Sequence, residues 1–336
     1  MSGARPDQAG QAVSAVAPSV QAVLDAGGEP VVRLMERIER RMAELATGHG
    51  PLLARYAGDT IAAGGKRLRP LLVCLAADAP PPETEALVRA AVAVELVHGA
   101  TLVHDDVLDG SPLRRGRPTV MAAGGRRLAT ATGDLLFSRA FAELAASGSL
   151  DAVRILSRAS SELARGELMQ RSDAWNAEVG VARYLERCRL KTAVLFRAAC
   201  ELGALEGSGE AVALGAFGEQ IGLAFQILDD VLDVSGPPER TGKPRGADLL
   251  DGTVTLPLII ARSRDVALRE LDVRKVTGSA AAAAVCERIT ATGALEVAKG
   301  RALELVERAK RDLPALTSRQ RAALDLVADG VVERYS

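Results

Sequence analysis

Apolar residues in this 336-residue chain recur at spacings of three and four, whereas the alternation that is typical of strands is scarce. Segments of helical length lie between helix-breaking clusters such as Ala79-Pro80-Pro81-Pro82 and Gly236-Pro237-Pro238. Residues 1–28 are rich in Ala, Gly, Pro and Ser and lack this period. The sequence therefore predicts an all-α chain, with a mobile tail over residues 1–28 and one helical domain over residues 29–336.

Composition excludes several classes of function. The net charge is −1, which argues against a nucleic-acid partner held by a basic surface. The most apolar stretch, residues 86–103, is interrupted by Arg89, Glu95 and His98, so no membrane-spanning segment is predicted. No N-terminal signal peptide is recognisable. Four widely spaced cysteines in apolar surroundings indicate buried free thiols and a cytoplasmic location: Cys74, Cys188, Cys200 and Cys286.

The pentapeptide Asp-Asp-Val-Leu-Asp occurs twice, at 105–109 (the first acidic segment) and at 229–233 (the second acidic segment). Each copy ends an apolar helical run and precedes Gly and Pro. Residues four apart share a helix face, so the first and last Asp of each copy should project together. This arrangement repels like charges and opposes the helix dipole, and a divalent cation relieves both penalties. Carboxylate ligands indicate Mg²⁺ bridged to phosphate; the alternative is a solvated acidic helix end.

Basic groups that suit a phosphate ligand accompany these segments. Three cations lie within residues 64–70, and three more lie within residues 114–119, directly after the first acidic segment. Lys191 and Thr192 interrupt an apolar helix, and Lys243 follows the second acidic segment. Each group alone is typical of a surface charge, but their linkage to the acidic segments favours diphosphate binding. His98 and His104 are six residues apart, which is unsuitable for a zinc pair on one helix face.

Taken in order, these motifs resemble those of the trans-polyprenyl diphosphate synthases. The resemblance runs from about Gly64 to Pro257 and comprises Gly-Gly-Lys-Arg-Leu-Arg-Pro (64–70), Glu-Leu-Val-His (95–98), the first acidic segment with Arg-Arg-Gly-Arg-Pro-Thr (114–119), Gly-Glu with Gln170, Lys-Thr-Ala (191–193), Phe-Gln-Ile-Leu-Asp-Asp (225–230), Gly-Lys-Pro (242–244) and Thr-Leu-Pro (255–257). It implies a homodimeric, isoprenoid-synthase-type antiparallel helix bundle around a deep central cavity. It also implies Mg²⁺-dependent joining of isopentenyl diphosphate to an allylic diphosphate, with three metal ions bound alongside the diphosphate.

The same resemblance assigns roles to individual residues. The principal Mg²⁺ ligands would be Asp105, Asp109 and Asp229, with Asp106, Asp230 and Asp233 nearby or acting through water. The allylic diphosphate would be held by Arg114, Lys191, Thr192, Gln226 and Lys243. Isopentenyl diphosphate would be held by Lys66, Arg69, His98 and Arg115. The chemistry itself would depend on Asp105, Asp109, Asp229, Lys191 and Arg114. One departure is Thr253, which replaces a Lys common in the family and so predicts weaker substrate affinity.

Product length is expected to depend on the residues one helical turn before the first acidic segment. Ala100 and Thr101 lie five and four residues before Asp105 and are small, which leaves room for a growing chain. The sequence therefore predicts a product of roughly thirty to fifty carbons. The alternatives are a shorter farnesyl or geranylgeranyl product, the catalytic subunit of a hetero-oligomeric synthase, and a class I terpene cyclase. The second acidic segment and residues 64–70 disfavour the cyclase. EF-hand spacing, which a general Ca²⁺-binding protein would show, is lacking.

Overall fold

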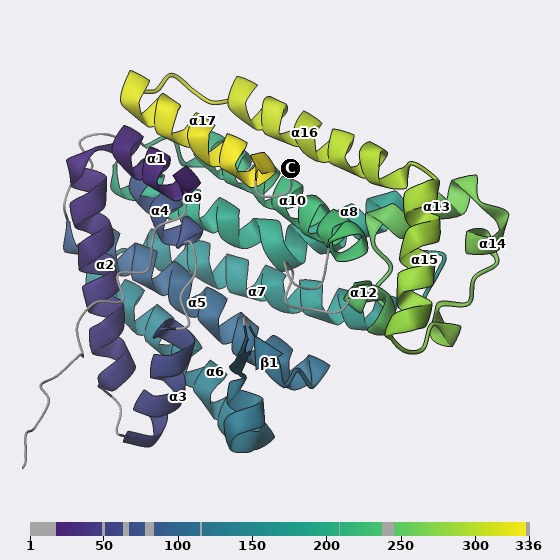
Figure 1. Cartoon of the computed structure of the whole chain (residues 1–336). Helices are drawn as coiled ribbons and strands as arrows, with labels where there is room; N and C mark the ends of the chain where they lie inside the picture. The colour runs from purple at the N-terminus through teal and green to yellow at the C-terminus, as the bar shows by residue number, and fades with distance from the viewer. Residues whose placement is uncertain are drawn as a thin grey trace, which may run out of the picture.

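The computed structural model describes residues 18–48, 51–62, 67–77, 84–114, 116–207, 209–236 and 245–333, which are overwhelmingly helical (Figure 1). The first half contains α1 (Pro18–Gly27), α2 (Glu29–Thr47), α3 (Pro51–Ala62), α4 (Leu68–Ala76), α5 (Glu85–Asp109), the strands β1 (Leu113–Arg114) and β2 (Arg117–Pro118), α6 (Val120–Ser147) and α7 (Leu150–Asp173). The second half contains α8 (Val181–Cys188), the π-helical turn η1 (Arg189–Ala193), α9 (Val194–Glu206), α10 (Ala211–Ser235), α12 (Ala247–Leu250), α13 (Leu256–Arg264), α14 (Val266–Arg269), η2 (Val273–Lys275), α15 (Ser279–Ala291), α16 (Ala294–Arg311) and α17 (Ser318–Glu333).

Helix α5 is the central helix of the bundle and carries the first acidic segment at its C-terminal end. The Thr84 side chain caps its start by accepting the Leu87 N–H, and Gly110 ends it in the left-handed conformation (φ 65°). Its residues between Leu87 and Val97 are nearly all buried, because α4, α6 and α9 pack around it. Helices α5 and α10 are long and apolar enough to cross a membrane by composition alone. Burial of 67% and 50% of the respective windows is what core helices of a bundle show.

Short connections fix the relative directions of the central helices. The β1–β2 hairpin joins α5 to α6, and Gly148 with Ser149 joins α6 to α7, so α5 and α7 run in the same direction and α6 runs against both. Residues 207–210 likewise join α9 to α10 in an antiparallel pair. The C-terminal ends of α5 and α7 therefore lie at the same end of the bundle. The predicted all-α antiparallel bundle is confirmed over the described ranges.

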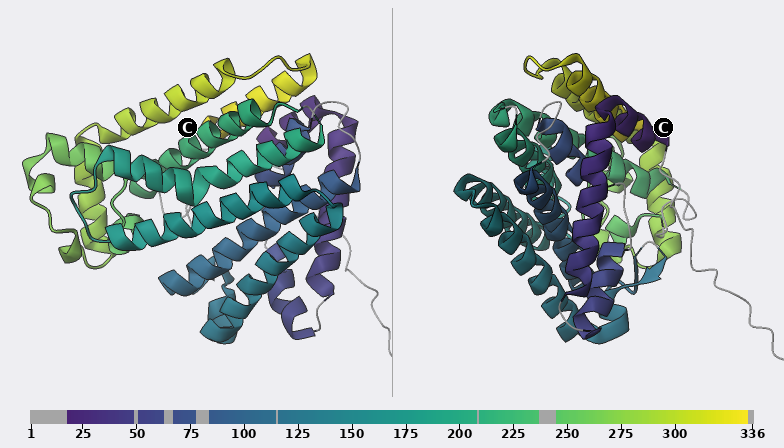
Figure 2. Two further views of the ribbon diagram at one scale, coloured as in Figure 1. Left: turned by 180° about the vertical axis from the view of Figure 1, so that it is seen from behind. Right: turned by 90° about the vertical axis from the view of Figure 1, so that its left-hand side faces the viewer.

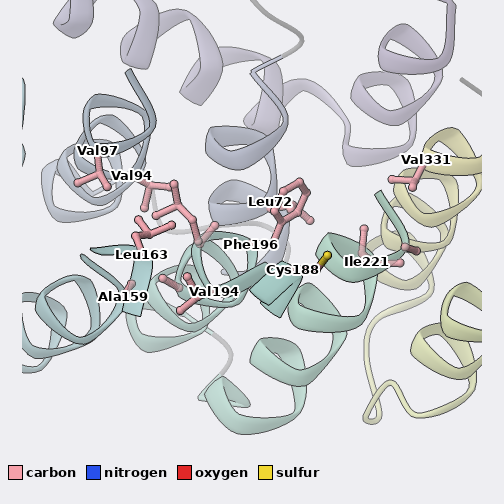
Figure 3. Packing of buried hydrophobic residues seen from close by; sticks show 14 of the residues in the cluster. Leu72, Val94, Val97, Ala159, Leu163, Cys188, Val194, Phe196, Ile221 and Val331 are labelled. Carbon is pink, nitrogen blue, oxygen red and sulfur yellow. The ribbon is translucent and has the colours of Figure 1, made fainter. Parts of the chain in front are cut away.

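The core is continuous from α4 and α5 across to α10 and α17. Figure 3 shows Phe196 of α9 near Leu72 of α4, with Val94 of α5 and Leu163 of α7 lying nearby. The four cysteines are all buried and free, as the sequence predicted. Burial raises the pKa of the Cys74 thiol to about 12, so the thiol stays protonated and unreactive at neutral pH.

The predicted tail over residues 1–28 is wrong for its last part. Residues 18–27 form α1, which packs against the C-terminal helix α17 and buries Val23. Figure 2 shows this contact on the side of the bundle that α16 and α17 cover. With ten residues α1 is too short to be stable as an isolated helix, and the contact with α17, about 300 residues away in sequence, stabilises it. Residues 1–17 lie outside the described residues.

Candidate active site

The first acidic segment has two faces. Asp105 and Asp109 lie on one side of the last turns of α5, half-buried and exposed respectively. Asp106 lies on the other side, is only 4% exposed, and its Oδ1 accepts hydrogen bonds from Arg114 Nη2 (2.7 Å) and Nε (2.9 Å). Arg114 belongs to the β1–β2 hairpin, so this ion pair holds the hairpin against the end of α5. Asp106 is therefore buried and held within the protein, whereas Asp105 and Asp109 lie on the more accessible side of the helix.

Asp105 lies in an environment that disfavours its charge. Burial raises the pKa of Asp105 to about 6, and the neighbouring carboxylates of Glu167 and Asp109 act in the same direction. Lys191 and Arg114 oppose this rise through their positive charges. A bound cation would stabilise the charged form of a carboxylate in such surroundings. Carboxylate oxygens are also the ligands that hard divalent metals bind.

The second acidic segment repeats this division on α10. Asp230 is 4% exposed and accepts hydrogen bonds from the Tyr184 hydroxyl (2.6 Å) and from the Gln226 amide (2.8 Å). Burial raises the pKa of Asp230 well above its usual range, and the charges of Asp248 and Asp229 add to the rise. Asp229 is exposed. Asp230 is therefore a buried organising group, whereas Asp229 faces outward.

The π-helical turn η1 connects the two acidic segments. Lys191 Nζ lies 2.7 Å from Glu167 Oε2 of α7, and its charge also reaches Asp105. The next residue, Thr192, donates its hydroxyl to Gln226 Oε1 (2.6 Å), one turn before Asp229. A π turn within an α-helix is found frequently at functional sites, because the extra residue redirects side chains. Here it directs two adjacent polar side chains towards the two acidic helices.

Two glycines let the neighbouring helices reach the backbone of η1. A Cβ at Gly166 of α7 would lie 2.7 Å from Lys191 N, and a Cβ at Gly222 of α10 would lie 2.6 Å from Ala193 Cα. Both distances are far inside ordinary contact, so only glycine permits this packing. The position of Lys191 is thus set by close backbone packing on both sides.

An ion chain that sequence reasoning missed runs across this site. Arg171 of α7 donates to Asp109 (2.6 Å) and to Glu167 (2.8 Å), and Glu167 in turn holds Lys191. The signals in the sequence were the Gly-Glu motif, which contains Glu167, and the four-residue spacing of Glu167 and Arg171 on one helix. The contact to Asp109 joins residues 62 positions apart and has no local signature.

The predicted isopentenyl diphosphate residues are only partly described. Arg69 begins α4, and its guanidinium lies 4.5 Å from the centroid of the Phe196 ring. His98 lies half-buried on α5. The neighbouring Arg67 is a structural cation, since it binds Glu39, Glu95 and the Ile61 carbonyl. Three further predicted residues lie outside the described residues: Lys66, Arg115 and Lys243.

The remaining predicted residues lie on α5 and near α12. Ala100 is fully buried, and Thr101 is half-buried with its hydroxyl donated to the His98 carbonyl (2.8 Å). The side chain of Asp233 accepts the Asp248 N–H (3.3 Å). Thr253 is half-buried and donates its N–H to the Asp248 carbonyl (2.8 Å).

The carboxylates of the two acidic segments do not form a metal site by themselves. Among the residues that the structure describes, no three His, Cys, Asp or Glu side chains form a ready-made metal cage. Mg²⁺ is usually bound by one or two carboxylates together with waters and substrate phosphates. The outward pair Asp105 and Asp109 and the separate Asp229 fit that mode, in which the phosphate ligand completes the coordination.

Comparison with known proteins identifies the family. Residues 51–291 match the family model described as polyprenyl synthetase. This chain belongs to the polyprenyl synthetase family. It is 43% identical over 265 residues to the heptaprenyl diphosphate synthase component 2 of Geobacillus stearothermophilus, covering 78% of this chain and 82% of that protein. It is 38% identical over 291 residues to the geranylgeranyl diphosphate synthase of Methanosarcina mazei, covering 84% and 88% of the two chains.

The fold of this polyprenyl synthetase is also that of a solved relative. The crystal structure of a polyprenyl synthase from Caulobacter crescentus CB15, complexed with calcium and isoprenyl diphosphate, matches it with a TM-score of 0.85 at 35% identity. The match covers 94% of this chain and 98% of that one. The predictions of an isoprenoid-synthase fold and of a prenyltransferase of the polyprenyl diphosphate synthase type are confirmed.

Proposed function

We propose that this prenyltransferase condenses isopentenyl diphosphate head to tail with an allylic diphosphate, in a site formed by both acidic segments and η1. The observation that carries this proposal is that two adjacent residues of η1 interact with the two helices that bear the acidic segments, α5 and α10. Lys191 is coupled to Asp105 through charge, and Thr192 is bonded to Gln226 of α10. A single diphosphate bound at η1 would thus meet cationic, hydroxyl and carboxylate groups from three helices.

The metal in this proposal is Mg²⁺, in three ions, and its direct ligands are Asp105, Asp109 and Asp229. Asp106 and Asp230 are buried and hydrogen-bonded to side chains of the protein, and Asp233 accepts a main-chain N–H, so we assign these three to positioning. When bound, Mg²⁺ would neutralise charge on the diphosphate leaving group. The calcium in the Caulobacter complex supports a divalent cation for this fold.

The residues of the chain perform the other tasks. Lys191, fixed by Glu167, supplies positive charge to the allylic diphosphate, and Thr192 with Gln226 orients it. Arg114 supplies further charge at the end of α5 while it holds Asp106. Arg69 and His98, together with Lys66 and Arg115, are proposed for isopentenyl diphosphate, and Lys243 for the allylic diphosphate. The apolar surroundings would protect the allylic cation from water, and the departing diphosphate would accept the proton released on coupling.

We propose a medium or long product, whose chain length depends on Ala100 and Thr101 of α5. The complete burial of Ala100 supports this assignment, because any larger side chain there would project among the core residues. Relatives of both kinds, heptaprenyl and geranylgeranyl synthases, match the chain, so the shorter product is the alternative.

We further propose a cytoplasmic homodimer. The buried free thiols support a reducing compartment, and Leu108 and Leu113 expose apolar surface beside the first acidic segment. The alternative is the catalytic half of a two-component synthase, because the Geobacillus relative is named as a component. Light scattering and activity of the purified chain alone distinguish the two.

The proposed reaction is tested by incubating the purified chain with isopentenyl diphosphate, each allylic primer and Mg²⁺, and sizing the products. Asp105→Ala and Asp229→Ala should each reduce turnover by about a hundredfold or more, since each removes a proposed metal ligand. Asp151→Ala removes an exposed carboxylate of α7 far from the site and should leave the rate unchanged. Normal turnover in either site variant would contradict the proposal, as would a cyclic hydrocarbon formed from the allylic substrate alone.

A further inference from the structure

Arg171 occupies a position at the site that no role assigned so far explains. Its guanidinium donates to Asp109 Oδ1 at the end of α5 and to Glu167 Oε1 on its own helix, at 2.6 and 2.8 Å. Its side chain is 43% exposed, so water reaches it, and a ligand at the site could displace it. Figure 1 shows α5 and α7 ending near each other, which brings the two residues together across 62 positions of sequence.

The contacts form an unbroken alternation of charge. Asp109 is bound by Arg171, Arg171 by Glu167, and Glu167 by Lys191. Each contact is 2.8 Å or shorter, within the range of charge-assisted hydrogen bonds. Asp109 and Lys191 are the anionic and cationic ends of this chain, and both are proposed to bind the incoming magnesium diphosphate.

We propose that Arg171 is the built-in counter-ion of the first acidic segment, which occupies Asp109 until the magnesium diphosphate replaces it. This inference rests on the proposed function, because it takes Asp109 to be a metal ligand. Arg171 is a positioning residue in this scheme. It remains bonded to Glu167 when Asp109 is released, and so keeps Glu167 available to hold Lys191.

Competition between Arg171 and the metal has a definite consequence. A Mg²⁺ ion that takes Oδ1 of Asp109 must displace the Arg171 guanidinium, so the contact weakens the measured metal affinity. An ion pair of this exposure should weaken it by about twofold to fivefold. The benefit is in the substrate-free enzyme, where the Arg171 guanidinium lies between Asp109 and Glu167 and offsets the repulsion between these two carboxylates.

The test is calorimetric titration of Mg²⁺ into the full chain in the presence of inorganic pyrophosphate. The variant is Arg171→Met, which keeps the length of the side chain and removes its charge. Arg171→Lys restores a point charge, and Arg154→Met, on an exposed part of the same helix, is the matched control. The magnesium concentration for half-maximal activity and the metal-free melting temperature are measured alongside.

Arg171→Met should bind Mg²⁺ about twofold to fivefold more tightly than the wild type, and the half-activating concentration should fall by the same factor. Its metal-free form should melt at a lower temperature, whereas Arg171→Lys and Arg154→Met should remain close to the wild type. Equal or weaker Mg²⁺ binding by Arg171→Met would overturn the inference and leave the proposed function intact. Failure of the wild type itself to bind Mg²⁺ with pyrophosphate would overturn both.

Discussion

Replacing Gly166 by alanine should disrupt the site without touching a charged or polar side chain. A Cβ at this position lies 2.7 Å from Lys191 N and 2.9 Å from the Leu190 carbonyl carbon. The shorter distance is about 0.8 Å inside the roughly 3.5 Å of an ordinary carbon contact. The atoms that it meets are backbone atoms, so α7 and η1 must move apart.

The two effects of this substitution have opposite signs. Alanine in a helix gains about 0.5–1 kcal/mol over glycine, because the unfolded chain has less freedom to lose. Overpacking against a fixed backbone costs about 1–3 kcal/mol, so we expect a net loss of about 1–2 kcal/mol. Separation of the helices also pulls Glu167 away from Lys191, and a misplacement approaching 1 Å should lower kcat/KM by about ten- to a hundredfold.

The assay pairs urea unfolding with steady-state kinetics, and the chain offers a matched control. Gly300 lies within α16, and a Cβ added there would meet no neighbouring atom of the described residues within 4 Å. Gly300→Ala should therefore stabilise the protein by about 0.5–1 kcal/mol at full activity. If Gly166→Ala were as stable and active as Gly300→Ala, close packing at η1 would not set the position of Lys191, and the reasoning would be refuted.

Three further outcomes follow from the same structure. Tyr184→Phe should lower the free energy of unfolding by about 1–3 kcal/mol in urea, because a buried oxygen of Asp230 loses its hydroxyl donor; an unchanged midpoint would contradict the hydrogen bond. The pKa of Asp105 is raised to about 6 in the folded protein, so the folded state holds this proton more tightly than the unfolded chain does. The stability that the bound proton gives the metal-free protein is therefore fully present below about pH 4 and is lost as the pH rises through 6. Asp105→Asn in EDTA should therefore become more stable than the wild type by about 1–2 kcal/mol by pH 7, after allowance for the partial exposure of the group, and a pH-independent difference would argue against the shift. Ala100→Phe should shorten the product ladder on chromatography, and an unchanged ladder would place the chain-length determinant elsewhere.

Helical geometry alone anticipated much of the site. The i, i+4 spacing placed Asp105 and Asp109 on one face of α5, as the structure has it. The same geometry explains why the second Asp of each segment turns inward. One residue is about 100° of rotation around a helix, so Asp106 and Asp230 face the core when their neighbours face out. The resemblance had already set Asp106 and Asp230 apart from the principal ligands, and the rotation supplies the physical reason.

Other features depend on contacts that no local pattern encodes. The π turn at η1 is packed against Gly166 and Gly222, and nothing in its own residues distinguishes it from a continuous α-helix. The helix α1 is stabilised by α17, close to the far end of the chain. Arg67 reads as one of three phosphate-binding cations, yet it binds Glu39 and Glu95. Such roles are determined by which long-range partners reach a side chain, and the composition of a segment does not reveal them.

The most direct test of a shared site is a crystal structure with Mn²⁺, a substitute for Mg²⁺ with a strong anomalous signal, and inorganic pyrophosphate. Anomalous peaks should lie at the carboxylates of Asp105 and Asp109 and at that of Asp229, with one pyrophosphate in contact with the metal at both places and with Lys191. Metal bound at only one acidic segment, or two pyrophosphates bound separately, would contradict the account.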